Sequence, residues 1–119
     1  MPKALPVIDT TAPVCCAPVA AGPVDDEAAL HVALRLKALA DPVRVKLMSL
    51  LLADPVTGVN GGDLATAVGL AESTVSHHLG QLRKAGLVRS ERHGMSVMHR
   101  AHRDALAALC SVLDPNCCQ

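Results

Sequence analysis

The stretch LATAVGLAESTVSHHLGQLRKAGLV, residues 64–88, is the most informative part of this sequence about its fold. Its apolar residues recur at helical spacing, which predicts a short helix over about residues 63–68 and a longer helix over about residues 73–85. Gly69 and Gly86 follow these helices, and we expect positive φ at Gly69. Two helices joined by a tight turn that contains glycine are typical of a helix-turn-helix unit.

The second helix of this pair has one apolar face and one polar face. Val75, Leu79 and Leu82 fall at i, i+4 and i+7, which predicts a buried stripe. Away from the stripe, the stretch 73–81 has no charged side chain, whereas an ordinary solvent-exposed helix is richer in Glu and Lys. A recognition helix needs short polar groups that reach base edges and cations that reach phosphates. The polar positions that fit this role are Thr74, Ser76, His77, Gln81 and Lys84.

Residues 87–100 predict a β-hairpin. Apolar and polar residues alternate on both sides of a turn at His93 and Gly94. A helix-turn-helix followed by such a hairpin is a winged helix. At its tip, Arg92 and His93 are expected to reach phosphates or a minor groove.

Three further helices are expected around this unit. One begins at the acidic residues 25–27 and runs to about residue 40, the next begins at Asp41 with Pro42 in its first turn, and the last covers about residues 103–113. Residues 54–62 are rich in Gly and Pro and predict a loop. The first and last helices carry aliphatic faces without cover from the rest of the chain, so we expect a homodimer formed through them.

The predicted fold class is therefore mainly α with a β-hairpin wing, and the chain divides into three parts. Residues 1–24 form an N-terminal arm rich in Pro, Ala and Val, residues 25–113 form the winged helix-turn-helix domain, and residues 114–119 form a C-terminal tail.

The composition of the chain excludes some classes of function and favours others. The chain has 119 residues, enough for one domain, and contains no Phe, Tyr or Trp, which excludes aromatic base-stacking platforms. Residues 71–103 hold six Lys or Arg against two acidic residues, which favours a polyanionic partner. The longest apolar stretches are too short to span a bilayer and the N-terminus does not resemble a signal peptide, so we expect a cytoplasmic protein without membrane contact.

Two stretches resemble the ArsR/SmtB family of metal-responsive repressors. LKALADPVRVKLMSLL, residues 36–51, resembles the family's second helix, and TVSHHL-x-x-L-x-x-AGLV, residues 74–88, resembles its helix-turn-helix. The resemblance covers residues 25–113 and implies a winged-helix homodimer that binds operator DNA until a metal or metalloid ion binds. It assigns DNA contacts to Ser73, Thr74, Ser76, His77, His78 and Gln81.

The sequence departs from the family pattern in ways that bear on its sites. Ala71 stands where a capping Ser is frequent, so we expect Ser73 to cap the recognition helix instead. Asn60 and Gly62 occupy the positions of the C-x-C pair of many arsenic sensors, which removes that site. Asp104 has no downstream His, which argues against a zinc site on the last helix. The wing also lacks the aromatic residues that are usual there.

Five cysteines remain as ligand candidates. They have no C-x-x-C spacing, and a structural disulfide is not expected in the cytosol. Trivalent arsenic or antimony takes three sulfurs, and the pair Cys15–Cys16 resembles the N-terminal pair of some family members. The third sulfur is then expected from Cys110, Cys117 or Cys118, within one subunit or across the dimer. Cys110 also fits a small residue packed in the apolar face of its helix.

Other interpretations stay open at this point. The thiols could respond to oxidants, or bind cadmium or lead, in a repressor of the same fold. His93, His99 and His102 could form a metal cluster near the wing, although phosphate contact or solvent exposure is the more ordinary explanation. The basic segment could bind an acidic protein partner, so that the winged helix is a protein–protein module. An enzyme is not expected, because no nucleophile–base pair, phosphate loop or interior carboxylate pair is found.

Overall fold

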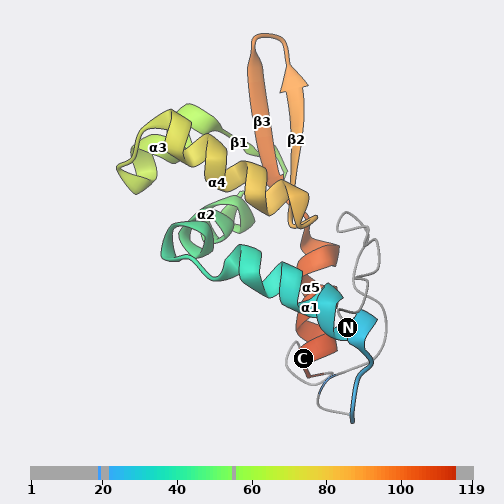
Figure 1. Ribbon diagram of the computed structural model, residues 1–119. Helices are drawn as coiled ribbons and strands as arrows, with labels where there is room; N and C mark the ends of the chain where they lie inside the picture. The colour runs from blue at the N-terminus through green and yellow to red at the C-terminus, as the bar shows by residue number, and fades with distance from the viewer. Residues whose placement is uncertain (1–18, 20–21, 55, 115–119) are drawn as a thin grey trace.

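The computed structural model describes residues 19, 22–54 and 56–114. Most of the predicted arm and of the predicted tail lie outside these residues, and so do Cys15, Cys16, Cys117 and Cys118. The described part contains five helices and three strands (Figure 1). In chain order they are α1 Asp26–Leu39, α2 Pro42–Ala53, β1 Val59–Asn60, α3 Gly61–Val68, α4 Glu72–Lys84, β2 Val88–His93, β3 Ser96–Ala101 and α5 Arg103–Leu113.

The predicted starts of α1 and α2 are confirmed by their caps. The Asp25 carboxylate accepts a hydrogen bond from the Ala28 N–H at 2.8 Å. The Asp41 carboxylate accepts from the Val43 N–H at 2.8 Å, and Pro42 begins the helix with its φ already set. Gly69 ends α3 with φ 71°, a left-handed conformation that glycine adopts without a Cβ clash, as expected.

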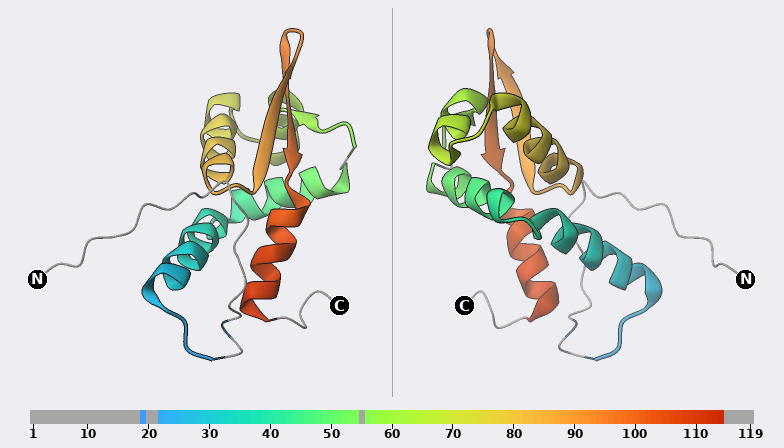
Figure 2. Two further views of the ribbon diagram at one scale, coloured as in Figure 1. Left: turned by 90° about the vertical axis from the view of Figure 1, so that its right-hand side faces the viewer. Right: turned by 60° about the vertical axis from the view of Figure 1, so that its left-hand side comes forward.

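The three strands form one antiparallel sheet in the order β1–β3–β2, and the hairpin projects away from the helices (Figure 2). Its turn is Gly94–Met95, because His93 still pairs with Ser96, so the predicted turn is one residue too early. The predicted loop over residues 54–62 is wrong at its end. Val59 and Asn60 pair with β3, and Asn60 then caps α3 by accepting from the Asp63 N–H.

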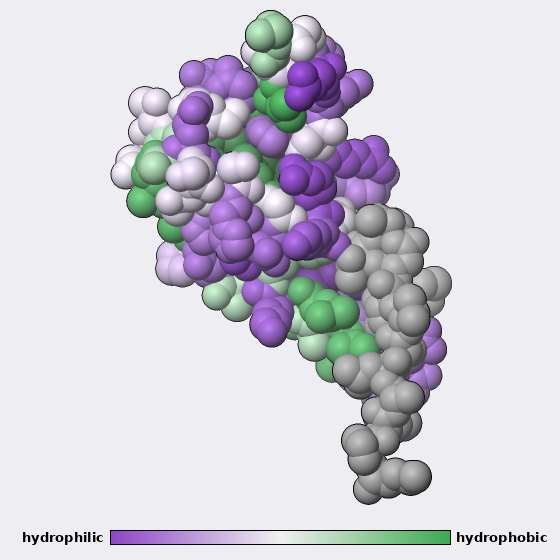
Figure 3. Space-filling view, turned by 45° about the horizontal axis from the view of Figure 1, so that its top comes forward, coloured by the Kyte–Doolittle hydropathy of each residue, from purple (hydrophilic) through white to green (hydrophobic). Residues whose placement is uncertain are grey.

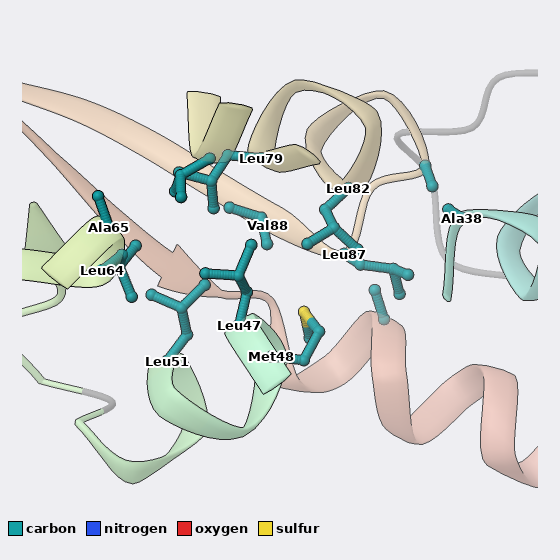
Figure 4. Packing of buried hydrophobic residues seen from close by; sticks show 13 residues of the cluster. Ala38, Leu47, Met48, Leu51, Leu64, Ala65, Leu79, Leu82, Leu87 and Val88 are labelled. Carbon is teal, nitrogen blue, oxygen red and sulfur yellow. The ribbon is translucent and has the colours of Figure 1, made fainter. Parts of the chain in front are cut away.

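The core is aliphatic, as the absence of aromatic residues requires. Leu47 and Leu51 of α2 meet Leu79 and Leu82 of α4, and all four are at most 1% exposed (Figure 4). Burying each such side chain contributes about 1.5–3 kcal/mol. The predicted stripe of α4 is therefore what fixes the orientation of the opposite, polar face of that helix.

Helices α1 and α5 pack together at the end of the molecule away from the hairpin tip. Their contact is a small cluster of Val32, Leu109 and Val112. The buried residues of α5 are Ala105, Leu109 and Val112, whereas Cys110 is half-buried and Leu113 is 38% exposed. None of the described helices is long and apolar enough to cross a membrane.

Candidate nucleic-acid interface and cysteine site

The first turns of α4 present a row of short polar side chains to solvent. Ser73, Thr74, Ser76 and His77 are exposed, while Val75 between them is fully buried. Hydrophilic side chains cover much of the molecular face below the hairpin (Figure 3). Four of the predicted DNA contacts thus lie on one helix turn with donors and acceptors facing outward, which suits readout of base edges in a major groove.

The expected cap of α4 by Ser73 is wrong. Ala71 is the N-cap residue and no side chain caps the helix, so Ser73 lies inside the first turn. The helix begins at Glu72, whose side chain lies close to the start of α3: a Cβ on Gly62 would lie 2.7 Å from the Glu72 Oε1. Because the Ser73 hydroxyl is not used in a cap, it is available for the predicted contact with DNA.

The other predicted contacts on α4 are placed differently from this row. His78 is half-buried, and its Nδ1 accepts a hydrogen bond from the Arg44 Nε at 3.0 Å. Gln81 is half-buried and Lys84 is exposed, and both line a hollow between α1, α2 and α4 together with Arg44. Arg44 therefore brings a cation to the edge of the recognition helix, a contribution that the sequence did not reveal.

The wing carries its predicted cations near the tip. Arg92 and His93 are exposed, and the His93 Nε2 lies 3.2 Å from a carboxylate oxygen of Glu91. Met95 occupies the turn and is 99% exposed. The tip therefore combines a cation, an imidazole and an apolar side chain, which are the groups that proteins insert into minor grooves.

A chain of hydrogen bonds ties the wing to the recognition helix. The Arg83 Nη1 donates to the Ser90 Oγ at 2.9 Å, and the Ser90 Oγ lies 2.7 Å from the His99 Nδ1. His99 is 8% exposed, and burial together with the nearby Arg83 charge lowers the pKa of its imidazole below 6.5. The neutral ring therefore links α4, β2 and β3, and this role was not predicted.

The possible histidine metal cluster at the wing does not form. His99 bonds Ser90, His93 lies beside Glu91, and His102 lies between the Arg89 guanidinium and the Gly86 carbonyl. Within residues 22–54 and 56–114, no three His, Cys, Asp or Glu side chains are grouped so that they could hold a metal ion.

Cys110 is the one candidate ligand that the described residues contain. It is half-buried on α5 and its sulfur is engaged in a disulfide. The expectation of no disulfide therefore fails at this position. A sulfur that forms a disulfide is within reach of a second cysteine, so Cys110 is more than a small packed residue.

Comparison with known proteins identifies the family. The family described as "Bacterial regulatory protein, arsR family" matches residues 41–90. The HTH-type transcriptional regulator NmtR of Mycobacterium tuberculosis is 39% identical over 87 residues, which cover 73% of this chain and 70% of that protein.

Two solved structures share this fold over most of the chain. A homodimeric winged helix-turn-helix DNA-binding domain from Mycobacterium bovis has a TM-score of 0.62 and 32% identity, over 74% of this chain and 82% of that one. The AntR antimony-specific transcriptional repressor has a TM-score of 0.61 and 29% identity, over 71% and 76%. The winged-helix prediction is thereby confirmed. This chain belongs to the arsR family of bacterial regulatory proteins, which are DNA-binding transcriptional regulators and not enzymes.

Proposed function

We propose that this chain is a homodimeric operator-binding repressor that releases DNA when trivalent arsenic or antimony binds its cysteine thiolates. DNA binding is supported above all by the row of exposed hydroxyl and imidazole groups at the start of α4. A fully buried Val75 lies between them, so the row is held in one orientation. An acidic protein partner would not need such a row of uncharged groups. The row therefore argues against the alternative that the winged helix is a protein–protein module.

The dimer part rests on α1 and α5. Leu36 and Leu113 remain 39% and 38% exposed on these helices, and a second copy is the natural cover for them. The similar domain from Mycobacterium bovis is described as homodimeric. A dimer would place two recognition helices about 34 Å apart, so that both enter the major groove on one side of the duplex. A bacterial operator lies in the cytoplasm, which agrees with the expected location.

The metalloid part rests on thiol chemistry. A soft trivalent ion prefers several thiolates, and the chain offers five cysteines, with Cys110 on a helix that also packs against α1. Cys15 and Cys16 supply two sulfurs in this proposal, and Cys110, Cys117 or Cys118 supplies the third. The likeness to an antimony-specific repressor supports the same ligand class.

In this proposal, release of DNA follows from a change in the geometry of the dimer. Ordering of the N-terminal arm against α5 would change how the two α1–α5 pairs meet. A small rotation then moves the recognition helices away from the spacing that one DNA turn demands. A differential affinity of several kcal/mol between the two arrangements suffices to clear an operator.

A redox response is the second candidate, because the sulfur of Cys110 forms a disulfide. Hydrogen peroxide would oxidise two thiols to a disulfide and be reduced to water. The same thiolates also suit cadmium and lead.

One titration separates these functions. The fully reduced protein is bound to a fluorescent duplex from its own promoter at fixed salt, and arsenite, antimonite, cadmium, lead, zinc or peroxide is added while anisotropy is followed. Release by arsenite or antimonite alone supports the proposal. Release by peroxide alone assigns a redox switch, and release by cadmium or lead alone changes the ligand. Failure to bind any duplex would refute the DNA-binding part.

A further inference from the structure

A strongly cationic hollow lies at the base of the hairpin. It has a volume of about 800 Å³ and is bounded by the last turn of α4, by strands β2 and β3 and by the start of α5. Its charged lining residues are Arg83, Arg89, Arg100 and Arg103, with Glu91 and Asp104 as the only acids among them. Four guanidinium groups around one hollow point to an anionic occupant.

Two of these arginines face each other directly. Arg89 on β2 and Arg100 on β3 are opposite in the antiparallel register. Like charges directly opposite on neighbouring strands destabilise a sheet. In addition, the Nε of Arg100 is buried and has no hydrogen-bond partner, and a buried donor without a partner costs about 1–3 kcal/mol. An anion between the two side chains would remove both penalties.

The acids nearby do not neutralise the arginines. Glu91 pairs with His93 instead, and among the residues that the structure describes Asp104 forms no ion pair with an arginine. His102 does not help either. The distances fit a neutral ring whose Nδ1–H donates to the Gly86 carbonyl at 3.0 Å while its Nε2 accepts from the Arg89 Nη2 at 3.0 Å.

The remaining two arginines frame the hollow and are already engaged. The Arg103 Nη2 donates to the Leu52 carbonyl at 3.1 Å, and the Arg83 Nη1 donates to Ser90. Arg89 uses its Nη2 on the His102 ring, and its remaining N–H groups, like the unpartnered Nε of Arg100, can bind a ligand. Planar guanidinium forks match the oxygen spacing of phosphate better than a lysine ammonium does.

We propose that Arg89 and Arg100 hold a phosphate-class oxyanion in this hollow. Two sources share that chemistry, a phosphodiester of the bound duplex and free inorganic phosphate. The first fits the position, because Arg83 belongs to the last turn of the recognition helix and β2 leads on to Arg92 at the wing tip. That source rests on the proposed DNA binding, whereas the free ion does not.

Two readouts on the variants Arg89→Gln and Arg100→Gln test this site, with Lys46→Gln as the matched control. Lys46 is an exposed cation on α2 that does not line the hollow. The first readout is the slope of log Kd for operator DNA against log salt. The second is the melting temperature in phosphate and in chloride at equal ionic strength. Because Arg89 is exposed, its variant keeps the test valid should Arg100→Gln fail to fold.

The outcomes separate the sources. A phosphodiester in the hollow lowers the salt slope by about one in each arginine variant and leaves Lys46→Gln like wild type. Free phosphate instead raises the melting temperature of wild type and of the control, and each arginine variant loses that rise while its slope is unchanged. Slopes and phosphate-dependent melting temperatures equal to wild type in both arginine variants would overturn the site. A wild-type protein that binds no duplex would refute the proposed function, while the melting experiment would still test the hollow.

Discussion

The Nε of Arg44 in α2 donates a hydrogen bond to the Nδ1 of His78 in α4 at 3.0 Å. Arg44 also reaches the Ala38 carbonyl at the end of α1, with its Nη1 at 3.4 Å. One side chain thus joins α1 and α2 to α4, the proposed recognition helix. We therefore expect His78 to position α4, while its neighbours on the exposed face make the proposed base contacts.

Replacing His78 tests this role. His78→Ala is expected to lower stability by about 1–3 kcal/mol, because it leaves a charged donor without its acceptor. Operator affinity falls with it, but the preference among base sequences is kept. His78→Asn restores an acceptor near the position of Nδ1 and should recover most of both losses. Denaturant unfolding and anisotropy measure the two effects. A variant of wild-type stability with altered base preference would instead make His78 a base contact.

The exposed row on α4 predicts the opposite behaviour. Ser76→Ala and His77→Ala should leave the free energy of unfolding within about 0.5 kcal/mol of wild type, because both side chains are exposed. Each should cost about 1–3 kcal/mol of discrimination between the operator and a scrambled duplex. Ser49→Ala on α2 is the control, since its hydroxyl is exposed and bonds only the Lys46 carbonyl among the contacts found. Equal losses on both duplexes would show that the row contacts phosphates.

The buried imidazole of His99 gives stability a pH dependence. Burial and the Arg83 charge lower the pKa of His99 in the folded state, whereas in the unfolded chain it is near 6.5. As the pH falls through 6.5, His99 binds a proton in the unfolded state but not in the folded state. The free energy of unfolding therefore decreases. His99→Gln should lose less stability than wild type between about pH 7.5 and pH 5.5 in denaturant titrations. Parallel losses in both proteins would contradict this assignment.

Gly58 is predicted to be required for closing the sheet. Its φ is +77°, and an added Cβ would lie 2.8 Å from the His99 carbonyl oxygen. Gly58→Ala therefore combines backbone strain with a backbone clash and should cost more than about 1–2 kcal/mol of unfolding free energy. Gly94→Ala is the matched control, because Gly94 has φ +62° but nothing within 4 Å of an added Cβ. Equal destabilisation of the two variants would show that the contact with β3 is irrelevant.

The helices could be predicted because their signals are local. Asp41 followed by Pro42 marks the start of α2, and the spacing of Val75, Leu79 and Leu82 marks the buried face of α4. Such patterns need only the hydrogen-bonding needs of a helix end and the period of a helix. Together with the predicted hairpin, these helices predict the order of elements of a winged helix.

The features that were missed depend on contacts between distant residues. Strand β1 is two residues long and exists only because β3 pairs with it. The Arg44–His78 bond joins residues 34 positions apart. No periodicity in the sequence encodes these contacts, and for the same reason the third sulfur ligand stays a prediction.

The proposed role of Cys15 and Cys16 as metalloid ligands is tested by operator release from reduced protein in which both are replaced by Ser. Anisotropy is measured with increasing arsenite on wild type and on the double variant, at one salt concentration. We expect equal operator affinity without arsenite, release of wild type, and no release of the double variant. A double variant that still leaves the operator at the same arsenite concentration as wild type would show that Cys15 and Cys16 are not the ligands.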